Sequence, residues 1–387
     1  MGVGETWRKL FTAALIATTL VWPAKAQLFE TRAKQAYLID AETGTILFSK
    51  NADAAFPPAS LAKLMTVEVA FDAIKSGQIS PEENFYISEH AWRTGGAVSG
   101  TSTMFAEVKS SVPLDALLKG VIVHSANDGA IAIAEGMAGS EESFARLMTT
   151  RARKLGLETS TFVNSTGLPA PGQVVTAREL TLLALHIWRN YPERYEMFSL
   201  PDFEWNGIRQ RNRNPLLPMN IGADGLKTGF TEESGYAITA SIERDGRRLF
   251  ATLGGMESEQ QRAEEARKML DWGIRAFEKM SLFGEGEPVA EADVYGGAKS
   301  TVKLRARKDV EIFVPITDRE RMRAEVVYQG PIEAPIQEGD EVGLLRIWLG
   351  DTISQETPVY AAEPVAKGEL HQRALDAVGE LLIGWLR

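Results

Sequence analysis

The chain has 387 residues, of which 44% are hydrophobic and 24% charged, and its formal net charge is −10. This length exceeds what a single hydrophobic core usually serves, so we expect two folded domains. The acidic balance argues against nucleic acid as a partner, because phosphate binding needs a basic face. The absence of cysteine excludes a thiol nucleophile and a disulfide scaffold. The four histidines lack the spacing of a metal site, and we expect neither a metal nor another cofactor.

Residues 1–26 have the pattern of a secretory signal peptide. A basic pair, Arg8 and Lys9, precedes an uncharged apolar run at 10–22 and an Ala-x-Ala cleavage site at 24–26. The apolar run is shorter than the roughly 20 residues that a membrane-spanning helix needs. We therefore expect cleavage and export rather than a membrane anchor at this end.

The first regular elements after this segment are predicted to be a β-hairpin and a helix. Residues 37–39 and 45–48 have strand-like sequences and flank a turn at 42–44. Two prolines at 57–58 end this region, and apolar side chains then recur at helical spacing over 60–74. The helix is therefore expected to begin at residue 60.

Three further helices are predicted in the middle of the chain. One follows Pro113, a residue type favoured in the first helical turn, and a second opens at Asn127 and is rich in alanine. The third begins with the capping box Thr176-x-x-Glu179. Its apolar residues up to Ile187 share one face, so this helix is expected to cover a core.

The rest of the chain is predicted to change from mixed to all-β structure. Segments 236–241 and 248–253 look like strands, and 260–277 looks like a helix. Gly284 to Pro288 form a candidate linker. Short alternating stretches from 289 to 360 then predict a small all-β domain, most simply a sandwich. Its clearest strands are 301–305, 310–314, 324–328 and 342–348.

The tail from Glu369 to Arg387 is amphipathic. On a helix its apolar side chains fall within one arc of about 120°, with polar residues opposite. We expect this helix to lie in a membrane surface; packing against the protein itself is the alternative.

Three short motifs carry the chemistry: Ser60-x-x-Lys63, Ser125-x-Asn127 and Lys227-Thr228-Gly229. A serine hydroxyl is a poor nucleophile unless a base lies beside it. Ser60 and Lys63 are three residues apart and share a helix face. A lysine serves as base only when burial or a neighbouring cation lowers its pKa, and we expect Lys227 to be that cation.

The other motif residues are expected to handle the substrate. Ser125 is placed to relay a proton to the leaving amine, and Asn127 to hold Lys63 and the substrate's amide.

The third motif is expected to dock a carboxylate. Lys227 and Thr228 would bind it, and Gly229 would leave room for a substrate lying along the strand edge. The backbone N–H groups of Ser60 and Phe230 would form the oxyanion hole.

A Ser-x-x-Lys string alone is weak, because ordinary residue frequencies produce about one in a chain of this size. Ser300-Thr301-Val302-Lys303 is a second copy. It lies in an alternating strand, where positions three apart face opposite sides. We therefore interpret the copy at Ser300 as a chance match.

With several other stretches, the motifs resemble those of low-molecular-mass penicillin-binding proteins of the D-alanyl-D-alanine carboxypeptidase type. The other matching stretches are 57–60, 124–128, 164–169, 224–229 and 264–267. The resemblance covers about residues 27–387. It implies an α/β catalytic domain with a five-stranded antiparallel sheet flanked by helices, β-lactamase/transpeptidase-like, an all-β domain and a C-terminal amphipathic helix. We accordingly divide the chain into a signal peptide (1–26), a penicillin-binding peptidase domain (27–285), an all-β domain (286–363) and a membrane-associating helix (364–387).

The resemblance also implies a function. Such enzymes remove the terminal D-alanine from peptidoglycan pentapeptides through an acyl-enzyme, here on Ser60 with Lys63 as base, and β-lactams acylate them. They work in the periplasm, at the outer face of the cytoplasmic membrane. Arg213 and Arg262 resemble family arginines near the carboxylate pocket, although each is equally compatible with a solvated surface position.

The chain departs from the family pattern in three places. Phe230 follows Lys-Thr-Gly where many relatives have histidine, and Ala126 stands where glycine is common. Residues 107–111 lack the Pro-Gly-Asp turn expected there.

Four other functions are alternatives. A β-lactamase of this fold would use a Glu-x-x-Leu-Asn string, which is absent. A Ser-His-Asp hydrolase would need His124 to face Ser125, which adjacent residues do not do. A DD-endopeptidase and a non-catalytic peptidoglycan-binding protein stay open.

Overall fold

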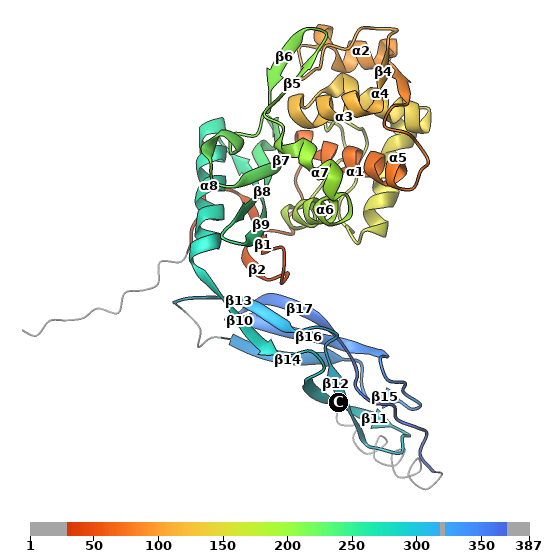
Figure 1. Ribbon diagram of the computed structural model, residues 1–387, viewed down its shortest axis with the longest axis vertical. Coiled ribbons are helices and arrows are strands. Elements are labelled where there is room, and N and C mark those ends of the chain that lie inside the picture. The colour runs from red at the N-terminus through yellow and green to blue at the C-terminus, as the bar shows by residue number, and fades with distance from the viewer. Residues whose placement is uncertain (1–28, 318–321, 370–387) are drawn as a thin grey trace, which may run out of the picture.

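The computed structural model describes residues 29–317 and 322–369. The predicted signal peptide and the predicted tail helix from residue 370 onward lie outside the described residues. Figure 1 shows a larger part, in which helices surround a sheet, and a narrower all-β part that extends from the side where β2 lies.

The larger part is built on a five-stranded antiparallel sheet, as expected. Its strand order is β2-β1-β9-β8-β7, so β7 lies at an edge. The bounds are β1 Gln35–Asp40, β2 Ile46–Lys50, β7 Ala223–Thr231, β8 Gly235–Arg244 and β9 Arg247–Met256. The predicted hairpin at 37–48 and the strands around the turn at 244–246 are confirmed.

Both faces of the sheet are covered, and its central strands are accordingly buried along most of their length. Leu38 points toward helix α8 (Glu259–Arg275), while its neighbours Tyr37 and Ile39 point toward helix α6 (Ala177–Asn190). This alternation follows from the two-residue period of a strand.

A second layer of helices packs around α1 (Lys63–Lys75), whose first nine residues are all buried. The other elements of the larger part are η1 Ala59–Ala62, β3 Asn84–Tyr86, α2 Glu89–Gly95, η2 Ala97–Ser99, β4 Ser111–Pro113, α3 Leu114–Lys119, η3 Gly120–His124, α4 Asn127–Ala138, α5 Glu141–Lys154, α7 Pro192–Tyr195, η4 Glu196–Ser199, β5 Asp202–Trp205, β6 Ile208–Arg211 and η5 Leu217–Met219.

Only half of the predicted capping box forms. Thr176 accepts a hydrogen bond from the N–H of Glu179 (3.1 Å), as expected. The Glu179 carboxylate instead accepts from the backbone N–H groups of Thr159 (2.8 Å) and Ser160 (2.7 Å). Glu179 therefore ties α6 to the preceding loop rather than closing its own helix end.

The all-β part contains a six-stranded sheet, in the order β14-β16-β17-β12-β11-β15, and a pair β10-β13. Side chains from both sheets share one core. The bounds are β10 Phe277–Phe283, β11 Pro288–Tyr295, β12 Thr301–Arg305, β13 Val310–Pro315, β14 Met322–Tyr328, β15 Ile332–Glu333, β16 Glu341–Leu349 and β17 Thr352–Ala361. The four clearest predicted strands are present as β12, β13, β14 and β16.

The two sequence boundaries of the all-β part differ from the prediction. Strand β10 pairs with β13, so the chain enters this part at Phe277, and residues 284–288 form a turn within it rather than a linker. At the other end, Val365 is buried and pairs with Ile336. Residues from 364 to 368 therefore belong with the β-strands rather than with the predicted helix.

The two parts meet at the β1–β2 turn. The Thr45 hydroxyl donates to Gln355 Oε1 (3.3 Å) and accepts from the N–H of Phe313 (3.1 Å). The Arg247 guanidinium lies 3.7 Å from the centre of the Phe313 ring. In the described residues, no helix is long and apolar enough to cross a membrane.

Candidate active site

Ser60 and Lys63 lie where the 3-10 turn η1 runs into α1. Lys63 Nζ donates a hydrogen bond to Ser60 Oγ (3.0 Å) and another to the carbonyl oxygen of Thr166 (2.5 Å). The lysine side chain is fully buried. The predicted nucleophile and base are thus in direct contact.

Burial decides the protonation state of Lys63. Loss of water around the amine, and then the positive charge of Arg213, lower its pKa from 10.5 to about 7, against the opposing charges of Glu141 and Asp128. Arg213 is thus one nearby cation, and the expected cation, Lys227, is coupled to Lys63 as well, since the charge of either lysine disfavours the charge of the other. A substantial share of the Lys63 amine is therefore neutral near pH 7 and able to accept a proton.

The loop that holds Lys63 is folded around Asn164. The Asn164 Oδ1 atom accepts from the N–H groups of Thr166 (3.3 Å) and Gly167 (2.7 Å). The Ser165 carbonyl accepts from Thr66 on α1 (2.7 Å), and the Ser165 hydroxyl donates to Glu141 (2.7 Å). The loop thereby aims the Thr166 carbonyl at the lysine.

Residues 164–169 match the family pattern, but the sequence alone predicts no role for them. An asparagine that bonds its own backbone two and three residues on is a recognisable turn signal. The contribution of Thr166, however, is a backbone carbonyl, which no side-chain pattern reveals.

The second motif supplies two buried polar atoms that lack partners. Ser125, in the left-handed conformation (φ 61°), follows the π-helical turn η3. Within the described part of the chain, Ser125 Oγ and Asn127 Oδ1 form no hydrogen bond. Because buried polar groups are nearly always paired, these two atoms are suited to a bound substrate.

Asn127 forms no hydrogen bond with Lys63, contrary to expectation. Its Nδ2 atom donates instead to the Thr101 hydroxyl (2.9 Å). The loop that carries Thr101 is fixed by buried Asp128, which accepts from Thr103 Oγ1 (2.6 Å) and from the N–H groups of Met104 and Ala106. Sequence reasoning missed Asp128 as a positioning residue.

The turn at 107–110 forms without the Pro-Gly-Asp sequence. Lys109 adopts a positive φ of 66°, a conformation usually given to glycine. The Ser110 hydroxyl donates to the carbonyl of Glu107 (2.7 Å) and closes the turn.

The third motif lies on the edge strand β7. Lys227 is buried, and its amine donates only to the carbonyl of Thr228 (3.1 Å) among the described residues. Burial, followed by the charges of Lys63, Arg213 and Arg262, holds the pKa of Lys227 well below its usual value. An incoming carboxylate would favour the protonated form of Lys227, so this group of basic residues is suited to an anion.

Gly229 serves the fold rather than the substrate. A Cβ atom at this position would lie 3.2 Å from Ala59 Cβ, Leu61 Cγ and the Pro58 carbonyl. The glycine therefore lets the turn that carries Ser60 approach β7 closely, and that it also leaves room for substrate stays a prediction.

Phe230, Tyr236 and Arg262 form a stack beside the motif. Phe230 is 49% exposed, and its ring lies 4.2 Å from that of Tyr236. The Arg262 guanidinium lies 5.5 Å from the centre of the Tyr236 ring. Arg262 is only 7% exposed, and its Nε atom has no hydrogen-bond partner among the described residues. Arg262 is thus no solvated surface residue. Arg213 is exposed, but its charge acts on both lysines.

His124 and Ser300 take no part in this site. His124 is buried between the Phe203 carbonyl (2.9 Å) and Gln210 Nε2 (3.2 Å), which occupy both ring nitrogens. Lys303 is exposed on β12 in the all-β part. In the described residues, no cluster of His, Asp and Glu is suited to a metal ion.

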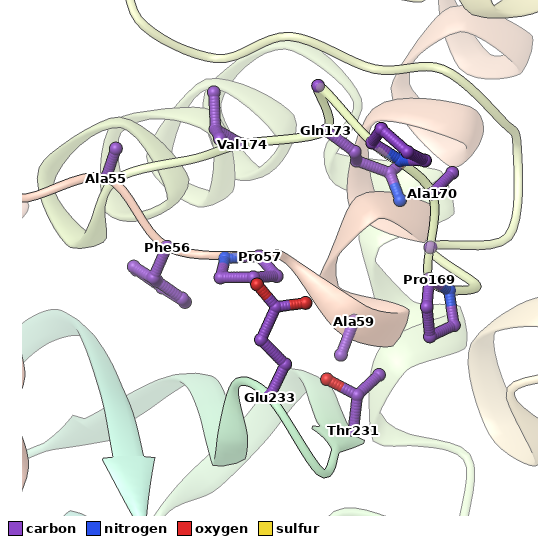
Figure 2. A pocket seen from close by; sticks show the side chains of 13 residues that line it. Ala55, Phe56, Pro57, Ala59, Pro169, Ala170, Gln173, Val174, Thr231 and Glu233 are labelled. Atoms are coloured by element: carbon purple, nitrogen blue, oxygen red, sulfur yellow. The ribbon is translucent and has the colours of Figure 1, made fainter.

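A groove of about 600 Å³ adjoins the turn that carries Ser60. Figure 2 shows residues 55–59, the loop 169–174 and the turn after β7 arranged around it.

Comparison with known proteins gives consistent matches over both parts. The family model described as D-alanyl-D-alanine carboxypeptidase matches residues 22–257, and that described as penicillin-binding protein 5, C-terminal domain, matches residues 277–367. The D-alanyl-D-alanine carboxypeptidase DacC of Escherichia coli K12 is 36% identical over 344 residues, which is 88% of this chain and 86% of that protein.

Solved structures extend the similarity to the fold. Penicillin-binding protein 5 from Haemophilus influenzae superposes with a TM-score of 0.73 at 32% identity, covering 87% of this chain and 98% of that one. Penicillin-binding protein D2 from Listeria monocytogenes in its ampicillin-bound form gives a TM-score of 0.55 at 28% identity, covering 64% of this chain and 99% of that one.

Proposed function

Because this chain belongs to the D-alanyl-D-alanine carboxypeptidase family, we propose that it removes the terminal D-alanine from peptidoglycan pentapeptides through an acyl-enzyme on Ser60. The observation that carries this proposal is the buried Lys63 amine, whose pKa is about 7 and which lies 3.0 Å from Ser60 Oγ. Such an amine is a base of suitable strength at neutral pH.

The acylation step uses the first two motifs. Neutral Lys63 accepts the hydroxyl proton as Ser60 Oγ attacks the carbonyl carbon of the penultimate D-alanine. The N–H groups of Ser60 and Phe230 stabilise the oxyanion. The C–N bond then breaks, and the proton passes through Ser125 to the amine of the departing D-alanine. Water next cleaves the ester and restores Ser60.

The substrate's terminal carboxylate binds at the third motif. Lys227 and Thr228 contact it, while Arg262 and Arg213 add positive charge. The same groups would hold the carboxylate of a β-lactam, which explains acylation by these antibiotics. The unpaired Asn127 Oδ1 and Ser125 Oγ receive substrate groups when the site is filled.

The place of action follows from the substrate. Peptidoglycan lies outside the cytoplasm, which requires export, and the pattern at residues 1–26 supports a signal peptide. We assign the mature protein to the periplasm, peripherally attached to the outer face of the cytoplasmic membrane by its amphipathic tail.

Mass spectrometry of the purified protein with penicillin and with a D-Ala-D-Ala peptide tests the proposal. We expect one long-lived penicilloyl adduct on Ser60 and release of D-alanine from the peptide. Ser60→Ala abolishes both, whereas Ser300→Ala, which removes the exposed serine of the chance motif, changes neither.

Two results would contradict this function. Rapid turnover of penicillin with no lasting adduct would indicate a β-lactamase. An unlabelled protein that releases no D-alanine would favour a non-catalytic peptidoglycan-binding role.

A further inference from the structure

The groove beside Ser60 is lined by residues that flank the nucleophile and its base in the sequence. Ala59 precedes Ser60 and lines the groove, and Gly167 follows Thr166, whose carbonyl holds Lys63. Its volume of about 600 Å³ lies within the range of sites for small ligands. The groove therefore adjoins the residues that flank the nucleophile and its base.

The walls of the groove are held in place by hydrogen bonds. Phe56 and Val175 exchange both backbone bonds (2.9 and 3.0 Å), which pins one end of the 169–174 loop. Gln173 Nε2 donates to the Leu168 carbonyl (3.1 Å) and pins the other. A preformed cavity of this kind loses little entropy when a ligand enters.

Among the described residues that line the groove, Glu233 alone is charged. Its turn is fixed because the hydroxyls of Thr231 and Ser234 bond each other (2.8 Å) and each accepts the other residue's N–H. Figure 2 shows the carboxylate projecting from this turn toward the Pro57 side of the groove. It forms no ion pair with any described residue, so its charge is available to a ligand.

The position of the motif residues along β7 indicates which part of the substrate lies near Glu233. The leaving D-alanine's carboxylate belongs at Lys227 and Thr228, and the carbonyl that is attacked belongs at the N–H of Phe230. Successive residues of an extended chain advance about 3.3 Å each. The substrate residue that precedes D-Ala-D-Ala then lies beside Thr231, at the end of β7 where the turn with Glu233 begins.

We propose that this groove binds the stem peptide upstream of D-Ala-D-Ala, and that Glu233 selects stems whose adjoining residue carries a free side-chain amino group. The inference rests on the proposed function and names the substrate class of the same site. An exposed amine–carboxylate pair is weak and screened by salt, so the expected preference is modest.

The test compares two tripeptides on the purified protein: Nα-acetyl-L-lysyl-D-alanyl-D-alanine, with a free ε-amine, and its Nα,Nε-diacetyl counterpart. We expect kcat/KM to favour the free amine by about 3- to 5-fold, and the preference to shrink with added salt. Glu233→Gln should lower kcat/KM for the free amine only and so remove the preference. Glu232→Gln, which removes an exposed neighbouring charge outside the groove, should keep it.

Penicillin labelling of each variant verifies that the catalytic centre is intact. Release of D-alanine from both peptides at equal rates in the wild type, or an equal fall for both in Glu233→Gln, would overturn the subsite while leaving the carboxypeptidase function standing. Failure to release D-alanine from either peptide would overturn the function itself.

Discussion

The chemistry of Lys63 depends on residues far from it in sequence. Sequence reasoning paired it with Ser60, because spacing on one helix is a local property. It did not identify Arg213 as a nearby cation, since that contact arises only when the segment after β6 returns to η3, where the Arg213 N–H meets the Val123 carbonyl (3.3 Å). Local patterns therefore predict the nucleophile and base, whereas the charges around them can be identified only from the folded structure.

Removal of the Arg213 charge should shift the pH dependence of acylation. Penicillin acylation should rise with pH through about 7, because only neutral Lys63 accepts the proton. Arg213 lowers the pKa of Lys63, so Arg213→Gln should raise that pKa and move the inflection to higher pH. The measurement is the second-order acylation rate across the pH range. Arg209→Gln removes an exposed arginine paired with Asp202 and serves as control. An unmoved inflection in Arg213→Gln would contradict this assignment.

At the scale of elements, regular structure was easier to predict than the loops that complete the site. Helices α1, α6 and α8 and strands β8 and β9 were predicted because their apolar patterns are strong. Strand β17 was missed, because it is polar over Gln355–Pro358 and contains a proline that is rare in paired strands. The 164–168 loop acts through a carbonyl and a glycine, which periodicity does not detect.

Gly167 should be sensitive to substitution for two separable reasons. Its φ is +79°, and a Cβ atom would lie 1.7 Å from the Ala59 carbonyl oxygen, next to Ser60. Gly172 has a similar φ of +85° but open space around it. We expect Gly172→Ala to cost about 1 kcal/mol of stability from backbone strain alone, and Gly167→Ala about 2 to 5 kcal/mol with slower acylation.

Denaturant midpoints and penicillin acylation rates of the two variants check this. The comparison isolates the steric contact, since both alanines share the backbone strain. Equal midpoints and equal acylation rates would mean that the Ala59–Gly167 approach does not position Ser60.

For the whole molecule, chain length and the change in sequence pattern correctly predicted two folded parts, one mixed α/β and one all-β. The transition between them could not be placed from sequence, because 277–283 follows a helix without a break and becomes a strand only by pairing with β13. The docking of the all-β part through Thr45, Gln355 and Phe313 likewise depends on contacts between residues more than 200 positions apart. These contacts join the catalytic part to the all-β part.

Membrane attachment by the tail can be tested by truncation, and the fold of the all-β part decides where the chain should be cut. A truncation should be made after Glu369 rather than at Pro364, because Val365 is buried in the all-β core and its backbone pairs with Ile336. Loss of residues 370–387 removes the amphipathic sequence alone, so the shortened protein should move from the membrane pellet to the soluble fraction after cell fractionation. Penicillin labelling and thermal unfolding should not change, since the described core is intact. A truncated protein that still pellets with membranes would show that attachment lies elsewhere, whereas one released by high salt but not by truncation would point to charged groups on the folded parts.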